Sequence, residues 1–214
     1  MPITLDPSLP PSLYPLAWLV GRWEGSGALH RPDDEAGDRR VEQVLECTPT
    51  EEGTLAWVSE LHVIDQAAPL PPTSVFMRED APVDTSGTGD RRLLLRERGQ
   101  WRVGDPLPGQ DLAAARAAAP GSPAGVISYA LSASFEASSG EDATGAALWE
   151  GEVRGPRIQL ARRDGASAQP LETRMAGYIS GRLMWLWERR PHTPGADGDR
   201  AGMVPYLSLE LDRA

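Results

Sequence analysis

Lysine is absent from the sequence, and all 21 basic residues are arginine. A lysine Schiff base and a P-loop lysine are therefore excluded. Cys47 is the only cysteine, which excludes an internal disulfide and a site built from several cysteines, and we expect it to be a small buried strand residue. The histidines His30, His62 and His192 form no pair at helical spacing, so we expect no histidine-rich metal site.

Long apolar runs are also missing. Leu16–Val20 and Leu183–Trp187 are far shorter than the ~20 residues of a membrane-spanning helix, and the first residues lack the basic and apolar regions of a secretory signal. The formal net charge of −10 repels nucleic-acid phosphates and anionic lipid headgroups. We expect a cytoplasmic protein with neither a nucleic-acid nor a membrane partner.

Common catalytic motifs are missing too. The chain has no G-x-S-x-G hydrolase elbow and no G-x-G-x-x-G loop that opens a helix after a strand. Its acidic residues mostly alternate with apolar ones, as residues on the solvated face of a strand do. The sequence therefore assigns no catalytic residue.

Turn-forming residues are plentiful, with 22 glycines and 20 prolines. Between them lie short runs of alternating apolar and polar residues, the pattern of strands with one buried face. Strands are predicted at Gly21–Leu29, Val41–Cys47, Thr54–Ile64, Thr73–Glu79, Arg91–Arg98, Val126–Ala137, Ala146–Arg154, Arg157–Arg163, Leu171–Ile179, Arg182–Glu188 and Met203–Leu211. About ten or eleven antiparallel strands with little helix must remove their edges. We predict an all-β fold, an antiparallel closed β-barrel of about ten strands.

The domain organisation is predicted from composition. We assign residues 1–12 to an N-terminal extension and residues 13–214 to one barrel domain. Stretches rich in Gly, Pro, Ala or Asp predict loop insertions near residues 80–90, 104–125 and 191–202. In the second of these, Asp111 is placed to cap a short helix over Leu112–Ala119.

The most distinctive motif is G-x-W-x-G-x-G, formed by Gly21, Trp23, Gly25 and Gly27. An apolar turn at residues 13–20 precedes it, and we expect this turn to be a short helical plug at one end of the barrel. Glycines at alternate positions leave one side of a strand bare, so that the strand can bend strongly or another backbone can approach it.

With its P-L-A-W-L-V lead-in, this motif resembles the opening of the nitrobindin family. Gly155–Leu160 is similar to the family's G-x-R-I-E-L strand, and Gly181–Trp185 to its G-D-L-x-W strand. Nitrobindins are small β-barrels, related in architecture to fatty-acid-binding proteins, that hold haem b at one end of the barrel. The resemblance implies this barrel and, for members that bind haem, isomerisation of peroxynitrite to nitrate.

The chain departs from the family at the haem ligand. Tyr206 stands where the resemblance places the family's axial histidine, and His30–Asp34 replaces a Y-P-T-I stretch. A neutral imidazole binds ferric and ferrous haem, whereas tyrosine is the axial ligand in catalase. His62, on a predicted strand beside Trp57, is an alternative ligand, although a structural role is the simpler interpretation.

The sequence leaves the direction of the Tyr206 side chain open. Leu207, Leu209 and Leu211 share one face of the predicted strand, so an apolar interior would place Tyr206 outside. Pro205 can introduce a bulge that reverses this locally.

Three functions are compatible with the sequence. In the first, a nitrobindin-like barrel without its axial histidine has lost haem binding and isomerase activity, so that no cofactor is expected. In the second, a binding barrel holds a small apolar ligand against Trp23, Trp57, Trp185 or Trp187. In the third, Tyr206 ligates ferric haem b. The altered pocket residues also predict a cavity smaller or more occluded than a haem site, with Tyr206 near its opening.

Overall fold

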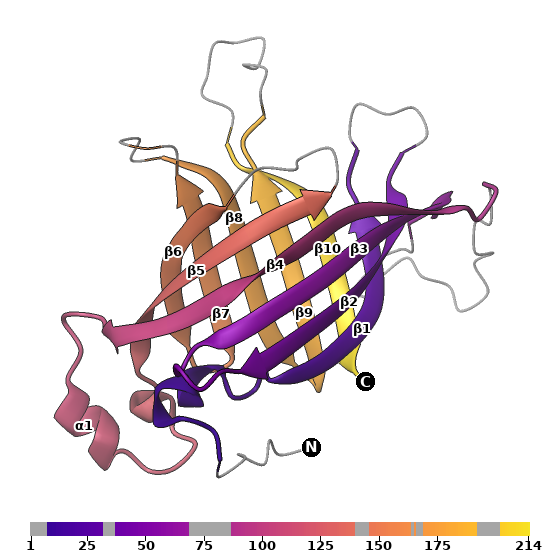
Figure 1. The fold of residues 1–214 in the computed structure, drawn as a ribbon. Coiled ribbons are helices and arrows are strands. Elements are labelled where there is room, and N and C mark those ends of the chain that lie inside the picture. Colours follow the sequence, from indigo (N-terminus) through magenta and orange to yellow (C-terminus); the bar gives the residue numbers. More distant parts are fainter. Residues whose placement is uncertain are drawn as a thin grey trace.

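A computed structural model describes residues 8–31, 37–68, 87–139, 146–163, 165, 169–191 and 202–214. In this part of the chain, ten antiparallel strands close into a barrel, in which β1 pairs with β10 and every other pair joins strands consecutive in the sequence (Figure 1). The strands are β1 (Gly21–Leu29), β2 (Arg39–Pro49), β3 (Leu55–Ala67), β4 (Arg91–Pro106), β5 (Ser128–Ser139), β6 (Ala147–Arg154), β7 (Arg157–Arg163), β8 (Pro170–Ile179), β9 (Arg182–Arg189) and β10 (Val204–Arg213). The predicted all-β closed barrel is confirmed.

The predicted end of one strand is wrong. The pattern ended a strand at Arg98, but β4 continues to Pro106. A Cβ atom at Gly99 would lie 1.8 Å from the Ser134 carbonyl oxygen, so this glycine permits close packing of β5 rather than ending the strand. The strand predicted at Thr73–Glu79 lies outside the described residues.

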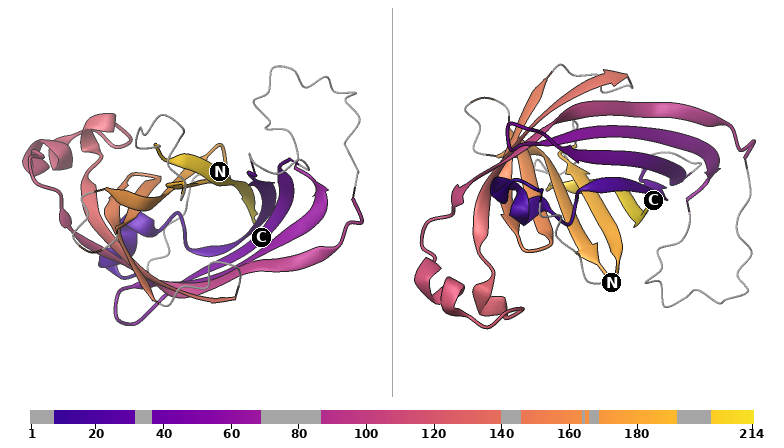
Figure 2. Two further views of the ribbon diagram at one scale, coloured as in Figure 1. Left: turned by 90° about the horizontal axis from the view of Figure 1, so that it is seen from above. Right: turned by 60° about the horizontal axis from the view of Figure 1, so that its bottom comes forward.

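A short helical plug closes one end of the barrel, as predicted. It consists of the 3₁₀ helix η1 (Pro11–Leu16) and the turn that follows, whose side chains Leu13, Leu16 and Leu19 are fully buried. The plug lies at the end of the barrel that contains the turn between β2 and β3. There the Ser12 hydroxyl donates a hydrogen bond to the Gly53 carbonyl at 3.3 Å. Figure 2 shows this end of the barrel in its right-hand view.

The glycines of the G-x-W-x-G-x-G motif let β10 close the barrel against β1. A Cβ atom at Gly25 would lie 2.1 Å from the Glu210 carbonyl oxygen, and one at Gly27 would lie 1.8 Å from that of Ser208. No side chain fits at these distances, so the bare face of β1 is used for close backbone approach, as expected.

Aromatic rings fill the interior next to the plug. Trp57 has its ring centroid 5.3 Å from Trp101, 5.5 Å from Phe135 and 5.4 Å from Trp185. Cys47 is buried on β2, as predicted, and burial raises the pKa of its thiol far above the ordinary value. The half of the barrel nearest the plug is therefore a packed core.

The second predicted insertion contains the expected capped helix. The Asp111 carboxylate accepts a hydrogen bond from the Ala114 amide at 2.9 Å, and α1 runs over Leu112–Ala117 instead of reaching Ala119. A single 3₁₀ turn, η2 (Pro123–Gly125), follows before β5. No helix among the described residues is both long enough and apolar enough to span a membrane.

Candidate functional site

A cavity of about 490 Å³ lies at the end of the barrel opposite the plug. Because neighbouring strands are antiparallel, odd-numbered strands contribute residues from their second half, such as Leu29 of β1. Most even-numbered strands contribute residues from their first half, such as Leu94 of β4. This volume is within the range of about 300–1,000 Å³ found for small-molecule sites. The apolar part of the wall is formed by Leu29, Leu61, Leu94, Leu95, Phe135, Ala137, Ala147, Trp149, Leu171, Trp187 and Leu207.

Tyr206 lines this cavity. The pairing of β10 with β9 shifts between Pro205 and Leu207, so that β10 has one extra residue and Tyr206 occupies the bulge. The Tyr206 ring packs edge-on against Trp187, with centroids 6.1 Å apart. The bulge, the alternative that the sequence had left open, therefore decides the direction of this side chain.

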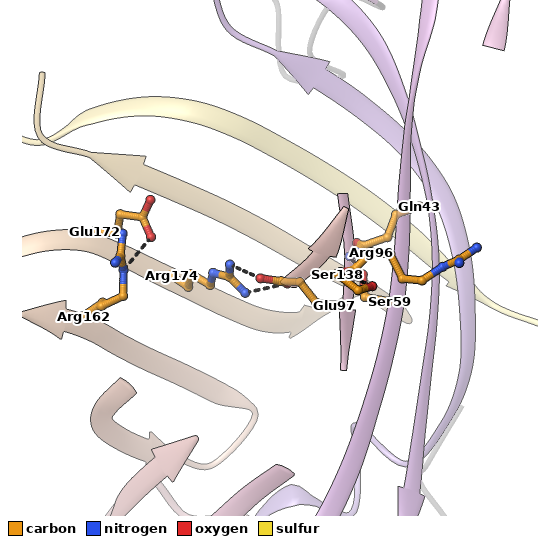
Figure 3. A network of polar contacts seen from close by, with 8 residues as sticks. All are labelled: Gln43, Ser59, Arg96, Glu97, Ser138, Arg162, Glu172 and Arg174. Carbon is orange, nitrogen blue, oxygen red and sulfur yellow. Dashed lines mark hydrogen bonds and ion pairs between the residues drawn. The ribbon is translucent and has the colours of Figure 1, made fainter. Parts of the chain in front are cut away.

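An ion pair crosses the interior at the inner end of the cavity. Arg174 of β8 donates two hydrogen bonds to Glu97 of β4, at 2.9 and 2.6 Å, and the two side chains are only 4% and 6% exposed (Figure 3). Three strands separate β8 from β4 in the sheet, so the pair spans the barrel instead of joining neighbours. Burial alone would lower the pKa of the Arg174 guanidinium, but the Glu97 carboxylate outweighs burial and raises it.

Aromatic rings surround the Arg174 guanidinium. Its central carbon lies 3.7 Å from the ring centroid of Trp187, 4.4 Å from that of Trp149 and 5.2 Å from that of Phe135. Cation–π contacts of this kind strengthen when they are shielded from water. The floor of the cavity is therefore polar at its centre and aromatic around it.

More arginines stand nearer the mouth of the cavity. Arg162 pairs with Glu172 at 3.1 Å, as Figure 3 also shows. The guanidinium carbon of Arg189 lies 5.1 Å from the Tyr206 ring centroid, and Arg190 contacts the amide oxygen of Gln169. The sequence analysis missed Glu97, Arg174 and these mouth arginines.

A signal for Glu97 was present in the sequence. It shares the parity of Leu95 and Trp101, and a charged residue among apolar residues of one parity marks a strand that lines a polar part of the interior. Arg174 was harder to find, because the large apolar residues of its strand alternate with it and suggest the wrong inner face. One of them, Ile179, is 61% exposed. Only the barrel shows that Arg174 and Ala176 are on the inner face.

Neither of the two described histidines, His30 and His62, offers a free nitrogen to the cavity. His30 lies at the mouth, but its Nδ1 is 2.7 Å from Asp38 Oδ2 and its Nε2 is 3.1 Å from the Ser208 hydroxyl. Ser208 alternates with buried leucines on β10 and is therefore on the outer face of the strand. His62 alternates with the buried Leu61 and Val63 and thus points outward. Burial, followed by the charge of Arg91, lowers the pKa of His62. His192 lies outside the described residues, among which no three His, Cys, Asp or Glu side chains group to hold a metal.

The tryptophans predicted to hold a ligand divide into two groups. Of the four alternatives, Trp187 lines the cavity, whereas Trp23, Trp57 and Trp185 do not. Trp23 is fully buried and donates its indole hydrogen to the Leu19 carbonyl at 2.9 Å, which fixes it against the plug. Trp149, which the sequence analysis did not select, is the second tryptophan of the cavity wall.

This architecture corresponds to a known family. The family model of the THAP4-like, heme-binding beta-barrel domain matches residues 12–213. The chain belongs to this family. A ferric nitrobindin-like protein of Beutenbergia cavernae is 34% identical over 203 residues, which cover 86% of this chain and 89% of the relative. Peroxynitrite isomerases of Micrococcus luteus and Kocuria rhizophila are 30% and 26% identical, over all of this chain and 88% and 96% of the relatives.

The described cavity wall of this THAP4-like barrel offers no free imidazole to a haem. Haem proteins hold the iron with a His, Cys, Met or Tyr side chain. Of these, the described cavity wall contains His30 and Tyr206, and both ring nitrogens of His30 are engaged by Asp38 and Ser208. Tyr206 is the other residue of these types in the described wall.

Proposed function

We propose that this chain is a non-catalytic binding member of its family, whose cavity holds a small organic ligand and which has lost imidazole-ligated haem and peroxynitrite isomerisation. The inward direction of Tyr206, at the position where the resemblance expects the axial histidine, is the observation that carries the proposal. The binding site is the cavity of about 490 Å³, whose wall combines leucines and aromatic rings with arginines.

The interior charges support this proposal. The Arg174–Glu97 pair and the rings around it already occupy the centre of the cavity floor. A ligand that enters from the mouth meets aromatic walls, which suit a flat or apolar body. No residue of the wall needs to act as an acid, base or nucleophile for such binding.

Titration with hemin tests the loss of haem. We expect no saturable Soret shift at one hemin per chain, because the described wall offers no open imidazole. Tyr206→His is expected to create such a shift by supplying a ligand that binds haem in both oxidation states. Tyr14→Phe, at an exposed tyrosine of the plug, is the matched control and should behave as the unchanged protein. A saturable, one-to-one Soret shift in the unchanged protein would contradict the proposal.

A second candidate function is ferric haem binding through the Tyr206 phenolate. The position of the Arg189 guanidinium, 5.1 Å from the phenol ring centroid, favours it, because a nearby cation stabilises a phenolate. In this case the unchanged protein would show a ferric Soret shift that Tyr206→Phe abolishes and Tyr14→Phe retains. Loss of the band on reduction with dithionite would distinguish it from imidazole ligation.

A further inference from the structure

We propose that the mouth of the cavity binds the anionic head of an amphipathic organic ligand, and that Arg189 and Arg190 select it. This inference rests on the proposed function, since it requires that the cavity binds a ligand, and it adds the chemical class of that ligand. The head is a carboxylate or another oxyanion, and the body is apolar and aromatic or aliphatic.

Arg189 and Arg190 are two of the five arginines among the described residues that line the cavity, beside Arg31, Arg162 and Arg174. Arg174 is paired with Glu97, and Arg162 with Glu172. Neither Arg189 nor Arg190 has a carboxylate within 4.0 Å among the described residues, and the contacts they make are with the Tyr206 ring and the neutral Gln169 amide. Two adjacent cations at the mouth of an apolar cavity attract an anion, although the whole chain carries a formal charge of −10.

Three buried donor atoms belong to side chains that line the cavity. Arg174 Nε, Arg190 Nε and Trp187 Nε1 are buried and have no hydrogen-bond partner in the described structure. All three groups are donors without acceptor capacity, and an unsatisfied buried donor is costly. These atoms have almost no accessible surface, so a ligand in the cavity does not reach them, but their partial positive charges add to the charge of the arginines around it.

The aromatic wall excludes a small inorganic anion as the main ligand. Trp187, Trp149 and Phe135 line the cavity around the Arg174 guanidinium, and aromatic rings favour contact with an organic body. The same residues distinguish this site from a surface patch of arginines. The ligand therefore combines an anionic head with an apolar body.

Two fluorescent probes that differ in one group test the inference. The anionic probe is 8-anilinonaphthalene-1-sulfonate, and the neutral probe, N-phenyl-1-naphthylamine, has the same ring system without the sulfonate. We expect the chain to bind the anionic probe at least about tenfold more tightly, the factor that a charge-assisted hydrogen bond contributes to a binding constant. Raising the salt concentration from about 0.1 M to about 1 M shortens the Debye length from about 10 Å to about 3 Å. This change should weaken the binding of the anionic probe and leave the binding of the neutral probe unchanged.

Variants locate the effect. Arg189→Gln and Arg190→Gln should each lower the affinity for the anionic probe about tenfold. The affinity for the neutral probe should change less than about twofold. Arg157→Gln, at an exposed arginine at the plug end of the barrel, removes the same charge far from the cavity and should change neither. Ala147→Trp fills the cavity and should weaken both probes.

The outcomes separate the two proposals. If neither probe binds, or if Ala147→Trp leaves both unchanged, the cavity is not the binding site and the proposed function is wrong. If both probes bind in the cavity with equal affinity, or if the Arg189 and Arg190 variants affect both probes alike, the cavity binds ligands but does not select anions. The latter result would overturn the inference and leave the proposed function intact.

Discussion

Arg174 is a buried charge in a mostly apolar interior. Glu97 neutralises it, and the guanidinium lies against the ring of Trp187. A buried ion pair gains little net stability, because the cost of removing two charges from water roughly offsets their attraction. What the pair does achieve is positional, since it joins strands on different sides of the barrel and sets the depth of the cavity.

Removing one member of this pair should be far more harmful than removing both. We expect Arg174→Met to lower the free energy of unfolding by about 3–5 kcal/mol, because it leaves Glu97 buried without a partner, and the double variant with Glu97→Leu to recover most of that loss. Urea unfolding followed by tryptophan fluorescence measures both. Arg98→Met is the control, since its pair with Glu136 is 69% and 53% exposed and should contribute less than about 1 kcal/mol. Equal losses in the single and double variants would contradict this account.

At the scale of elements, β10 performs two tasks that depend on its backbone. Its middle approaches β1 closely over Gly25 and Gly27, and its beginning bulges at Tyr206. The first task closes the barrel, and the second turns a phenol into the cavity. The opening motif of the chain is therefore a structural element of the seam, and the ligand site begins where β10 leaves regular pairing.

Gly27→Ala should disrupt the seam. The added methyl group would lie 1.8 Å from the Ser208 carbonyl oxygen and 2.8 Å from the Leu209 Cα, both backbone atoms that cannot move without shifting β10. We expect a loss of more than about 3 kcal/mol in the free energy of unfolding, beyond an ordinary overpacked core position. Gly202→Ala, where a methyl group would meet nothing within 4 Å, should stay within about 0.5 kcal/mol of the unchanged protein by the same measurement. A stable Gly27→Ala barrel would show that β1 and β10 need not lie this close.

The whole molecule is organised along the barrel axis. The plug and the aromatic cluster fill one end, and the cavity with its arginines occupies the other. Both halves share the same ten strands in the described part of the chain, because each strand runs from one end to the other. This arrangement supports our assignment of residues 13–214 to one domain, which remains a prediction.

One domain should unfold in one step. We expect far-UV circular dichroism, which reports the strands, and tryptophan fluorescence, which reports the seven tryptophans, to give coincident transitions in urea. All seven tryptophans are buried and lie in both halves of the barrel, so an independent unfolding of either half would separate the two curves. Curves with different midpoints would contradict the assignment.

Much of the fold could be predicted from the sequence because alternation along a strand is local. The runs around Leu131 and Leu45 show a period of two without any partner strand, and their number together with the scarcity of helix indicated a closed barrel. The short plug and the helix cap at Asp111 are local signals of the same kind. The motifs near both ends of the chain resemble the nitrobindin family, and this agrees with the family model that matches residues 12–213.

The site could not be predicted from the sequence, because its residues come together through contacts between distant strands. Tyr206 faces the cavity because β10 has one more residue than β9 at that point, and a bulge depends on the partner strand. Arg174 and Glu97 meet across 77 residues of sequence, and Trp187 rather than Trp23 lines the cavity because the plug covers Trp23. The sequence determined which residues alternate along each strand, whereas the closed barrel decided which faces turn inward and which side chains meet there, because register and closure are properties of paired strands.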